Sequence, residues 1–270
     1  MEFSDKLPDG NVNITQESPL KEFVILLSGV LGIVFIVYYL LGMLIDYSVR
    51  YLSPEQEQAL TIPLRPEWMT DAPPKQSKVL QDMVDQIQSE CAHLPYTLKV
   101  YIVNEEAINA VALPGGTILI FSGLLEKVRS ENELAFILGH EMGHFKNKDH
   151  LKGMGRALVL LVFSIMLLGP ENSVGSFILD SLNVAETGFS RDQESEADAF
   201  ALETLQCRYK HVGGATDFFD TLIREQEDLK FFSHFFASHP DHNERIQDLK
   251  TQASRAGYPY RPTIPYPGQN

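Results

Sequence analysis

The sequence predicts an α+β fold that is mainly helical, with a small sheet and one N-terminal transmembrane helix. Three observations support this prediction. Residues 23–45 form an apolar run without a charge, short β-prone segments cluster between 98 and 121, and helical spacing follows polar caps at several later positions. About 20 apolar residues are enough to cross a bilayer as a helix, whereas strands are short and are bounded by turn residues.

The composition is that of an ordinary globular chain with room for one sizeable domain. The 270 residues are 44% hydrophobic and 21% charged, and a chain of this length can bury one core. The formal net charge of −14 argues against nucleic-acid binding, which requires a basic surface. Cys91 and Cys207 lie far apart in the sequence. We interpret them as small buried apolar residues, with a disulfide as the less favoured alternative.

Composition divides the chain into five segments. They are a polar tail (1–22), the transmembrane helix (23–45), a proline-rich linker (46–75), the main domain (76–257) and a Pro/Tyr-rich tail (258–270). Lys21 and Arg50 flank the apolar run, one on each side. Because the basic residues balance, the positive-inside rule does not decide which way the helix crosses the membrane.

The main domain is predicted to hold its sheet between helices. The strand candidates are 98–103, 107–113 and 117–121. Helical spacing covers 76–92, and Ser130 followed by Glu133 fits a capping box that opens a second helix. Ser190 followed by Gln193 opens another helix in the same way, through about Leu205. A further helix is expected from Asp241 to Gly257.

One of these helices carries a pair of histidines that can bind one metal ion. His140 and His144 are four residues apart, so they stand on one face of a helix at the spacing that zinc needs. Glu141 lies beside the first histidine, where its carboxylate could take a proton from a water that the metal activates. The apolar residues 134–138 precede the motif. A buried helix needs partners for its polar groups, which favours a metal site over two surface histidines.

A catalytic zinc site needs a third protein ligand and an open position. The helix start at 190–198 is rich in carboxylates, and Glu194 and Asp198 share one face of it. We favour Glu194 as the ligand, with Asp198 placed to accept a hydrogen bond from a ligand histidine. The spacing alone leaves Glu196 and His150 as rival ligands, and an acidic first turn also suits the helix dipole.

Four ordered blocks within roughly residues 75 to 250 carry a resemblance to a known family. The blocks are 109–116 with 122–125, 138–144 with Asp149-His150, Ser190-Arg191 with Glu194 and Ala197-Asp198, and Ser238-His239-Pro240 with Arg245-Ile246. The set resembles metallopeptidase family M48, which groups the heat-shock protease HtpX, the CAAX prenyl proteases and the mitochondrial inner-membrane stress protease. CAAX prenyl proteases have many spans and this sequence has one clear span, so prenylated substrates are not expected.

The resemblance implies a zincin fold of the gluzincin type with one zinc ion. The implied zinc ligands are His140, His144 and Glu194. Glu141 is implied as the general base, and Asp198 as a residue that supports the site. His239 is implied near the open metal position, where it could stabilise the oxyanion of the tetrahedral intermediate, and Arg245 in the same region.

The resemblance also implies how a polypeptide substrate binds. Asn109, Ala110, Val111 and Ala112 would form an edge strand over the cleft, to which an extended substrate adds by main-chain hydrogen bonds. We expect a zinc endopeptidase that acts on damaged or unfolded membrane and envelope proteins. Its expected location is a bacterial inner membrane, in contact with the lipid bilayer, with the peptidase domain outside the cytoplasm.

Two alternative functions stay open. One is a membrane-tethered, chaperone-like binding protein with a structural zinc, which the presence of Glu141 disfavours because a structural site needs no base. The other is a latent enzyme whose cleft is closed by His239 or by the C-terminal tail.

A second apolar run, 157–168, follows the His-Glu helix. It is about a dozen residues long, short of the roughly 20 that a span needs. We therefore expect a buried or interfacial helix that dips into lipid close to the anchor, with 177–179 continuing its apolar surface.

Overall fold

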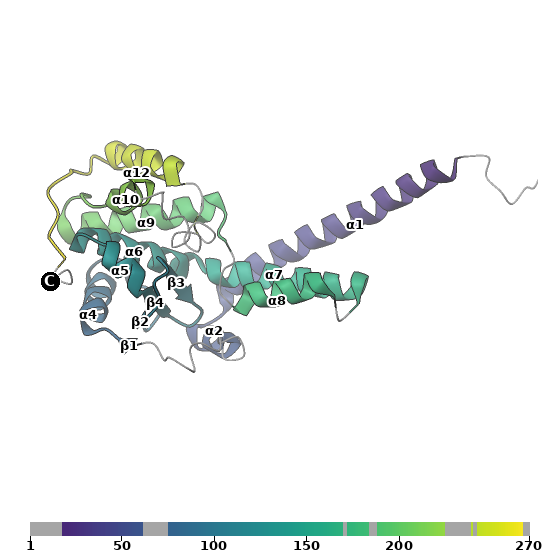
Figure 1. Ribbon diagram of the computed structural model, residues 1–270, viewed down its shortest axis with the longest axis horizontal. Coiled ribbons are helices and arrows are strands. Elements are labelled where there is room, and N and C mark those ends of the chain that lie inside the picture. The colour runs from purple at the N-terminus through teal and green to yellow at the C-terminus, as the bar shows by residue number, and fades with distance from the viewer. Residues whose placement is uncertain are drawn as a thin grey trace, which may run out of the picture.

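The structure is a computed structural model that describes residues 18–61, 75–169, 172–183, 188–224, 239 and 242–266. A long N-terminal helix, α1 (Pro19–Ser48), projects from a domain in which helices surround a small sheet (Figure 1). The expected polar tail lies mostly outside the described residues, as do 62–74 of the linker and 267–270 of the C-terminal tail.

The sheet has four strands in the order β1-β2-β4-β3. They are β1 (Lys75–Gln76), β2 (Lys99–Val103), β3 (Ala110–Leu113) and β4 (Thr117–Phe121). The β2–β4 pair is parallel, and the β1–β2 and β3–β4 pairs are antiparallel. All three predicted strands are present, although β3 begins later than the predicted 107. Because β3 ends the order, one of its edges pairs with no other strand in the described part of the chain.

Two helices form the centre of the domain. In α6 (Glu131–Asn147), every residue from 132 to 145 is buried. It packs along α9 (Arg191–Tyr209). A Cβ atom added at Gly143 would lie 2.8 Å from Cα of Ala197, and one added at Gly139 would lie 3.2 Å from Cα of Ala201. The two glycines therefore let the helix backbones approach, which sets the carboxylates of α9 opposite the histidines of α6.

Helix caps act as the sequence predicts. The side chain of Ser130 accepts a hydrogen bond from the backbone N–H of Glu133, and Ser190 with Gln193 forms a full capping box. These caps satisfy backbone N–H groups that have no partner inside a helix.

The remaining helices surround this centre or link it to α1. They are η1 (Val49–Tyr51), α2 (Pro54–Thr61), α4 (Lys78–Ile87), η3 (Gln88–Ala92), α5 (Ser122–Lys127), α7 (Asp149–Leu168), α8 (Ser173–Asn183), α10 (Asp217–Arg224) and α12 (His242–Ala256). The expected helix over 76–92 is divided between α4 and η3. The expected start of the last helix at Asp241 lies outside the described residues.

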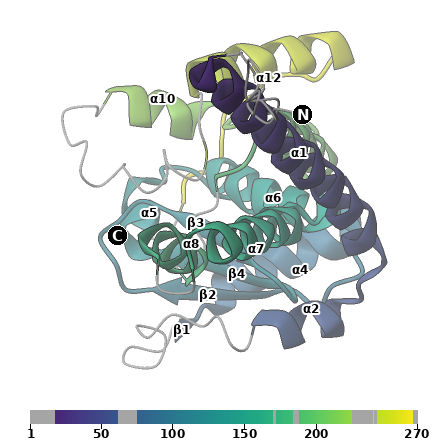
Figure 2. The ribbon, with the colours of Figure 1, turned by 90° about the vertical axis from the view of Figure 1, so that its right-hand side faces the viewer.

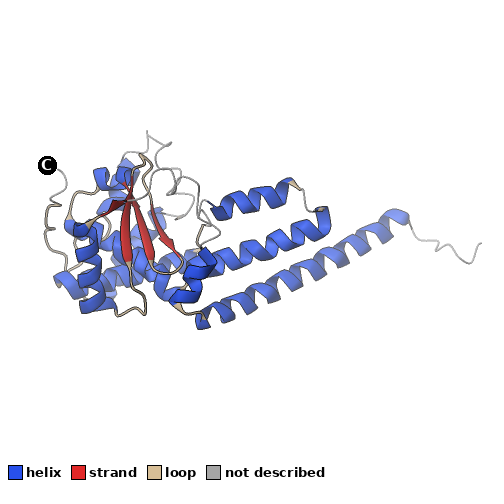
Figure 3. Cartoon of the chain, turned by 90° about the horizontal axis from the view of Figure 1, so that it is seen from below, coloured by secondary structure: helices blue, strands red, loops and turns tan. Residues whose placement is uncertain are grey.

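The helix that contains the second apolar run is longer than the sequence suggested. The run forms the C-terminal part of α7. The whole of α7 has 20 residues and, like α1, is long and apolar enough to cross a membrane. Of the two expected alternatives, the buried helix is wrong, because Met166 is 74% exposed and Leu168 is 62% exposed, and the interfacial helix stays a prediction. Helix α7 runs beside α1, and α8 turns back along α7 (Figures 2 and 3).

Close packing and one ion pair join α7 to the end of α1. A Cβ atom at Gly155 would lie 2.6 Å from Cγ2 of Ile45. Arg156 forms an ion pair with Asp46, the first charged residue after the apolar run. The two helices therefore leave the domain together.

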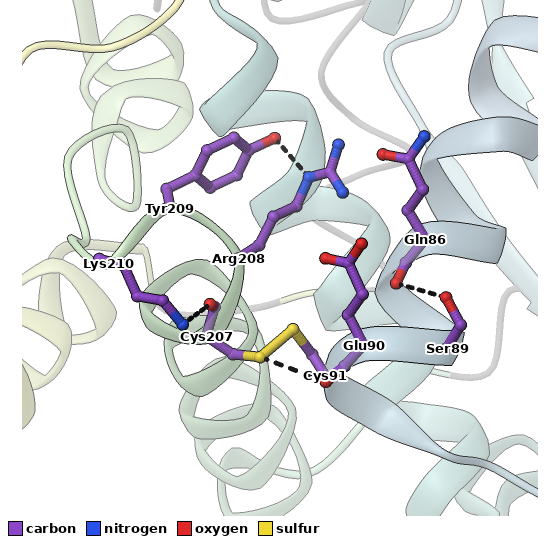
Figure 4. Close-up of a disulfide and its surroundings, with 8 residues drawn as sticks. All are labelled: Gln86, Ser89, Glu90, Cys91, Cys207, Arg208, Tyr209 and Lys210. Carbon is purple, nitrogen blue, oxygen red and sulfur yellow. Dashed lines mark hydrogen bonds between the residues drawn. A yellow bond between two sulfur atoms is a disulfide. The ribbon is translucent and has the colours of Figure 1, made fainter.

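The interpretation of the cysteines as unpaired apolar residues is wrong. Cys91 of η3 and Cys207 of α9 form a disulfide across 116 residues (Figure 4). The pairing depends on a tertiary approach of η3 to the C-terminal end of α9, which spacing in the sequence does not reveal.

The described part of the C-terminal tail packs against the domain. The backbone N–H of Glu131 donates to the carbonyl of Ile264, and Ser130 forms a β-bridge with Pro265. These contacts lie at the N-terminal end of α6, nine residues before His140, so this part of the tail does not cover the histidines.

Candidate metal centre

Four side chains from three parts of the chain meet at one buried point. They are His140 and His144 of α6, Glu194 of α9, and His239, and one ligand atom from each lies within 4.8 Å of the others. The Nε2 atoms of His140 and His144 are 3.1 Å apart. Nδ1 of His239 lies 2.9 Å from Oε1 of Glu194. The structure therefore brings together the three predicted ligands and places His239 beside them, in the region that the resemblance implies.

Each of the two histidine rings of α6 has a carboxylate next to its Nδ1 atom, on the side away from the cluster. Nδ1 of His140 lies 2.9 Å from Oδ1 of Asp198, and Nδ1 of His144 lies 3.1 Å from Oδ2 of Asp149. An imidazole that donates its Nδ1–H to a carboxylate presents the lone pair of Nε2, which is the arrangement found around zinc. Asp198 lies where the sequence predicts. Asp149 was missed in this role, although it stands in one of the four blocks that carry the resemblance.

Arg245 links the two carboxylates of α9. Its Nε and Nη2 donate to Asp198 at 2.7 and 2.6 Å, and its Nη1 lies 2.5 Å from Oε2 of Glu194. Burial by itself would raise the pKa of Asp198, but the Arg245 charge and the hydrogen bond with His140 lower it below its ordinary value. Arg245 therefore keeps the supporting carboxylate ionised inside the protein.

The protonation of the histidines follows from their surroundings. Burial lowers the pKa of His140, which favours the neutral ring that a metal requires. Burial also acts to lower the pKa of His144, but hydrogen bonds with Asp149 and Glu194 outweigh it and raise that pKa to about 9. For Glu194, burial acts to raise the pKa, whereas its interactions with His239, His140 and His144 lower it below its ordinary value, so the carboxylate is ionised.

Glu141 stands next to this cluster. Its side chain is 1% exposed, and Oε1 lies 3.8 Å from Nε2 of His239. Its Oε2 atom makes no hydrogen bond with any residue that the structure describes. A buried carboxylate oxygen of this kind can accept a proton from a reacting group.

His239 lies in direct contact with the other side chains of the cluster. Its Nδ1 is 3.2 Å from Nε2 of His140. Phe189 stacks on the His144 ring at a centroid distance of 3.8 Å and lies 5.5 Å from the His239 ring. Phe189 was not singled out from the sequence, because an isolated aromatic residue before a helix gives no signal of its place.

The two rival ligands lie away from the cluster. Glu196 is exposed and accepts a hydrogen bond from Asn147 at 3.0 Å. Nε2 of His150 lies 3.4 Å from Oε2 of Glu57. The choice of Glu194 over both therefore agrees with the geometry.

Comparison with known proteins identifies the family. The model of peptidase family M48 matches residues 74–253. The chain belongs to this family. Among similar proteins, the metalloprotease LoiP of Escherichia coli is 32% identical over 60% of this chain and 65% of its own length. The metalloprotease YcaL of the same organism is 29% identical over 58% of this chain and 61% of its own.

A eukaryotic relative matches a shorter stretch. The mitochondrial metalloendopeptidase OMA1 of Arabidopsis thaliana is 33% identical over 40% of this chain and 22% of its own length. The match to LoiP and YcaL also spans less than two thirds of those proteins.

The donor set of this M48 chain fits a zinc ion. Two imidazoles and a carboxylate are ligands that zinc takes in catalytic sites. The Nε2 atoms of His140 and His144 lie 3.1 Å apart, and each lies 3.5 Å from an oxygen of Glu194. Donor atoms that converge in this way would be shared by one cation held by His140, His144 and Glu194.

Strand β3 of the M48 domain runs next to α6. Ala110 and Ala112 are buried, Val111 is half-buried, and Asn109 is 3% exposed, with its Oδ1 accepting a hydrogen bond from the backbone N–H of Ala110. The backbone carbonyl of Asn109 accepts from the N–H of Phe121 of β4. Ala110, Val111 and Ala112 therefore lie in the end strand of the sheet beside α6, and Asn109 comes just before that strand.

Proposed function

We propose that this chain is a membrane-anchored, zinc-dependent endopeptidase. The observation that carries the proposal is the convergence of His140, His144 and Glu194 beside a buried Glu141 carboxylate oxygen without a hydrogen bond in the described structure. Membership of family M48 and the names of the metalloprotease relatives support the same conclusion.

The chemistry is peptide-bond hydrolysis. Zinc bound by the three ligands would supply a Lewis acid that polarises the scissile carbonyl and acidifies a water. Glu141 accepts the proton of the attacking water and passes it to the leaving amine. Asp198 and Asp149 hold the histidine rings in place, and Arg245 keeps Asp198 ionised. An extended polypeptide adds to the outer edge of β3 by main-chain hydrogen bonds, which makes recognition broad in sequence.

The membrane arrangement follows from α1, α7 and the disulfide. Helix α1 spans the bilayer, and the charge-free part of α7 rises about 18 Å at 1.5 Å per residue, so it enters one leaflet beside α1 and α8 returns. Disulfides persist in oxidising compartments. The pair Cys91–Cys207 therefore supports a domain outside the cytoplasm, on the outer face of a bacterial inner membrane.

The substrates are damaged or unfolded membrane and envelope proteins. The metal helix α6 ends at Asn147 and α7 begins at Asp149, two residues later, so the site lies close to the bilayer surface. Segments that leave the membrane or fail to enter it are within reach of this site.

The first experiment measures metal content and casein cleavage on the detergent-purified full chain, beside Glu141→Gln. We expect stoichiometric zinc in both proteins and cleavage in the wild type alone, lost also in a chelator. Zinc without cleavage in either protein would favour the chaperone-like binding protein with a structural zinc. The absence of zinc from both would refute the proposal.

A latent form is a second candidate, because His239 stands among the ligand atoms. As a fourth donor it would close the position that a substrate needs. In that case His239→Ala raises the rate of casein cleavage at unchanged zinc content. A fall in rate would instead favour the oxyanion role that the resemblance implies.

A further inference from the structure

We propose that Glu57 is a positioning residue, through which the segment after the membrane helix holds the metal ligand His144 in place. The proposal rests on the proposed function and extends it to a part of the chain that precedes the M48 match, which begins at residue 74. It adds the juxtamembrane helix α2 to the residues that build the site.

Helix α2 attaches to the domain through a charge. Glu57 is fully buried, whereas its neighbours Glu55, Gln56, Gln58 and Ala59 in the same helix are exposed. Burial of an isolated carboxylate is costly, so this helix is anchored only if the domain offers matching donors. Among the side chains of α2 that the structure describes, Glu57 is the buried one.

Several donors of the domain surround this one carboxylate, and four of them come from the described residues. The hydroxyl of Tyr96 and Nζ of Lys148 each lie 2.8 Å from Oε1 of Glu57. Nε2 of His150 and the backbone N of Gly115 each lie 3.4 Å from Oε2. Burial acts to raise the pKa of Glu57, but the hydrogen bonds from His150, Lys148 and Tyr96 outweigh it and lower it to about 2. The group is therefore ionised at neutral pH.

Two of these donors flank the residue that orients a metal ligand. Lys148 and His150 are the neighbours of Asp149, and Glu57 holds both. Asp149 is fully buried and accepts from Nδ1 of His144 at 3.1 Å. Lys148 adopts a left-handed backbone conformation, with φ of 56°, where α6 ends and α7 begins. A lysine there needs other contacts to compensate for the strained backbone, and its ion pair with Glu57 provides one.

The same helix contacts the turn that ends the substrate strand. Gly115 lies between β3 and β4, and a Cβ atom at that position would lie 2.8 Å from Cβ of Gln58. The backbone of Leu52 accepts a further hydrogen bond from Lys148. The segment that leaves the membrane thus contacts both the end of the metal helix and the end of β3, so its placement affects ligand and substrate strand together.

The test compares Glu57→Gln with Glu55→Gln in the full chain in detergent. Both changes remove one negative charge from α2, but Glu55 is exposed. We measure apparent zinc affinity by chelator competition, together with kcat and KM on casein. Because loss of outer contacts to zinc ligands lowers affinity by about 10–100-fold, we expect Glu57→Gln to lose about 10-fold, with kcat reduced and KM unchanged. Glu55→Gln should match the wild type.

A double variant separates positioning from a general loss of stability. If Glu57 acts through Asp149, then Glu57→Gln added to Asp149→Asn lowers zinc affinity by less than about twofold, because the same contact is already lost. A full tenfold loss in that background would overturn the proposal, and so would an unchanged affinity of the single variant. If Glu57→Gln does not fold, Lys148→Gln takes its place, with the same expected loss.

Zinc affinity is measured in the Glu141→Gln background as well, where no cleavage is needed. If the chain is not an endopeptidase, the Glu141→Gln protein binds zinc normally and the wild type still does not cleave casein. Failure of the positioning role would appear as equal affinities for Glu57→Gln and Glu55→Gln.

Discussion

Arg245 holds Asp198 by two hydrogen bonds of 2.7 and 2.6 Å, and both side chains are buried. The planar guanidinium suits this paired geometry, which a lysine cannot reproduce. Arg245→Lys keeps the positive charge but loses one of the bonds and the contact with Glu194. We expect zinc affinity to fall by about 10-fold, measured by chelator competition, while far-UV circular dichroism stays unchanged. Wild-type affinity in this variant would contradict the assigned role.

Glu194→Ala is expected to lose the metal. The carboxylate is the only acidic member of the cluster within the described residues, and without it only two of the three proposed zinc ligands remain. Metal analysis after purification checks this result. Glu196→Ala, which changes an exposed carboxylate two residues further along the same helix, is the control and should retain stoichiometric zinc. The opposite pattern would transfer the ligand role to Glu196.

Gly143→Ala should separate α6 from α9. The added Cβ would meet the backbone of Ala197 at 2.8 Å, a contact that neither helix can relieve by turning a side chain. Overpacking of this kind costs about 1–3 kcal/mol, so we expect a lower Tm together with weaker zinc binding. Gly139→Ala meets its neighbour at 3.2 Å and should lower the Tm less. Equal effects of the two changes would be inconsistent with this account.

Reduction of the Cys91–Cys207 disulfide should destabilise the domain. A disulfide that closes a loop of this length contributes about 2–5 kcal/mol. We expect the Tm to fall in dithiothreitol. The variant with both cysteines changed to serine should have the lower Tm in either condition and no response to the reductant. A wild-type Tm that ignores the reductant, with full reduction shown by mass spectrometry, would refute the prediction.

Glu133 should make stability depend on pH. Burial raises its pKa from the ordinary 4.5 to about 7, and one of its oxygens has no hydrogen-bond partner within the described residues. The folded protein therefore holds this proton at pH values where the unfolded chain has released it. It follows that stability falls as pH rises from about 4.5 to about 7, by about 3 kcal/mol at most.

Glu133→Gln removes this titration. Above about pH 7, the free energy of unfolding of the Glu133→Gln variant should exceed that of the wild type. The difference between the two proteins should shrink as the pH falls towards about 4.5. Urea unfolding across this range measures the difference, with Glu131→Gln, a half-buried neighbour in the same helix turn, as the control. Parallel curves for wild type and Glu133→Gln would rule out the raised pKa.

Local features of the sequence predicted the helices and most of the ligand cluster. The caps at Ser130 and Ser190, the apolar run 23–45 and the four-residue spacing of His140 and His144 all depend on neighbours within a few turns. These signals survive in the structure because the surrounding packing agrees with them. Glu194 required the family resemblance, since its spacing left Glu196 and His150 open.

Features that depend on contacts between segments far apart in the sequence were missed. The disulfide, the support from Asp149 and the burial of Glu57 each need segments that meet only after folding, and no periodicity marks them. The full length of α7 was missed for another reason. Lys152 and Arg156 interrupt its first turns, so the apolar run was counted only from residue 157. In the structure, Lys152 pairs with Asp149 and Arg156 with Asp46.

The C-terminal residues have a consequence for biogenesis. The carbonyl of Ile264 accepts a hydrogen bond from the N–H of Glu131 at the start of α6. The first turn of the helix that carries His140 and His144 therefore depends on residues that are synthesised much later. Glu194 and Arg245 also follow that helix in the chain. On the proposed function, the candidate membrane helix α1 is synthesised well before the residues that complete the metal site, and an incomplete chain that lacks Glu194 is expected to be inactive.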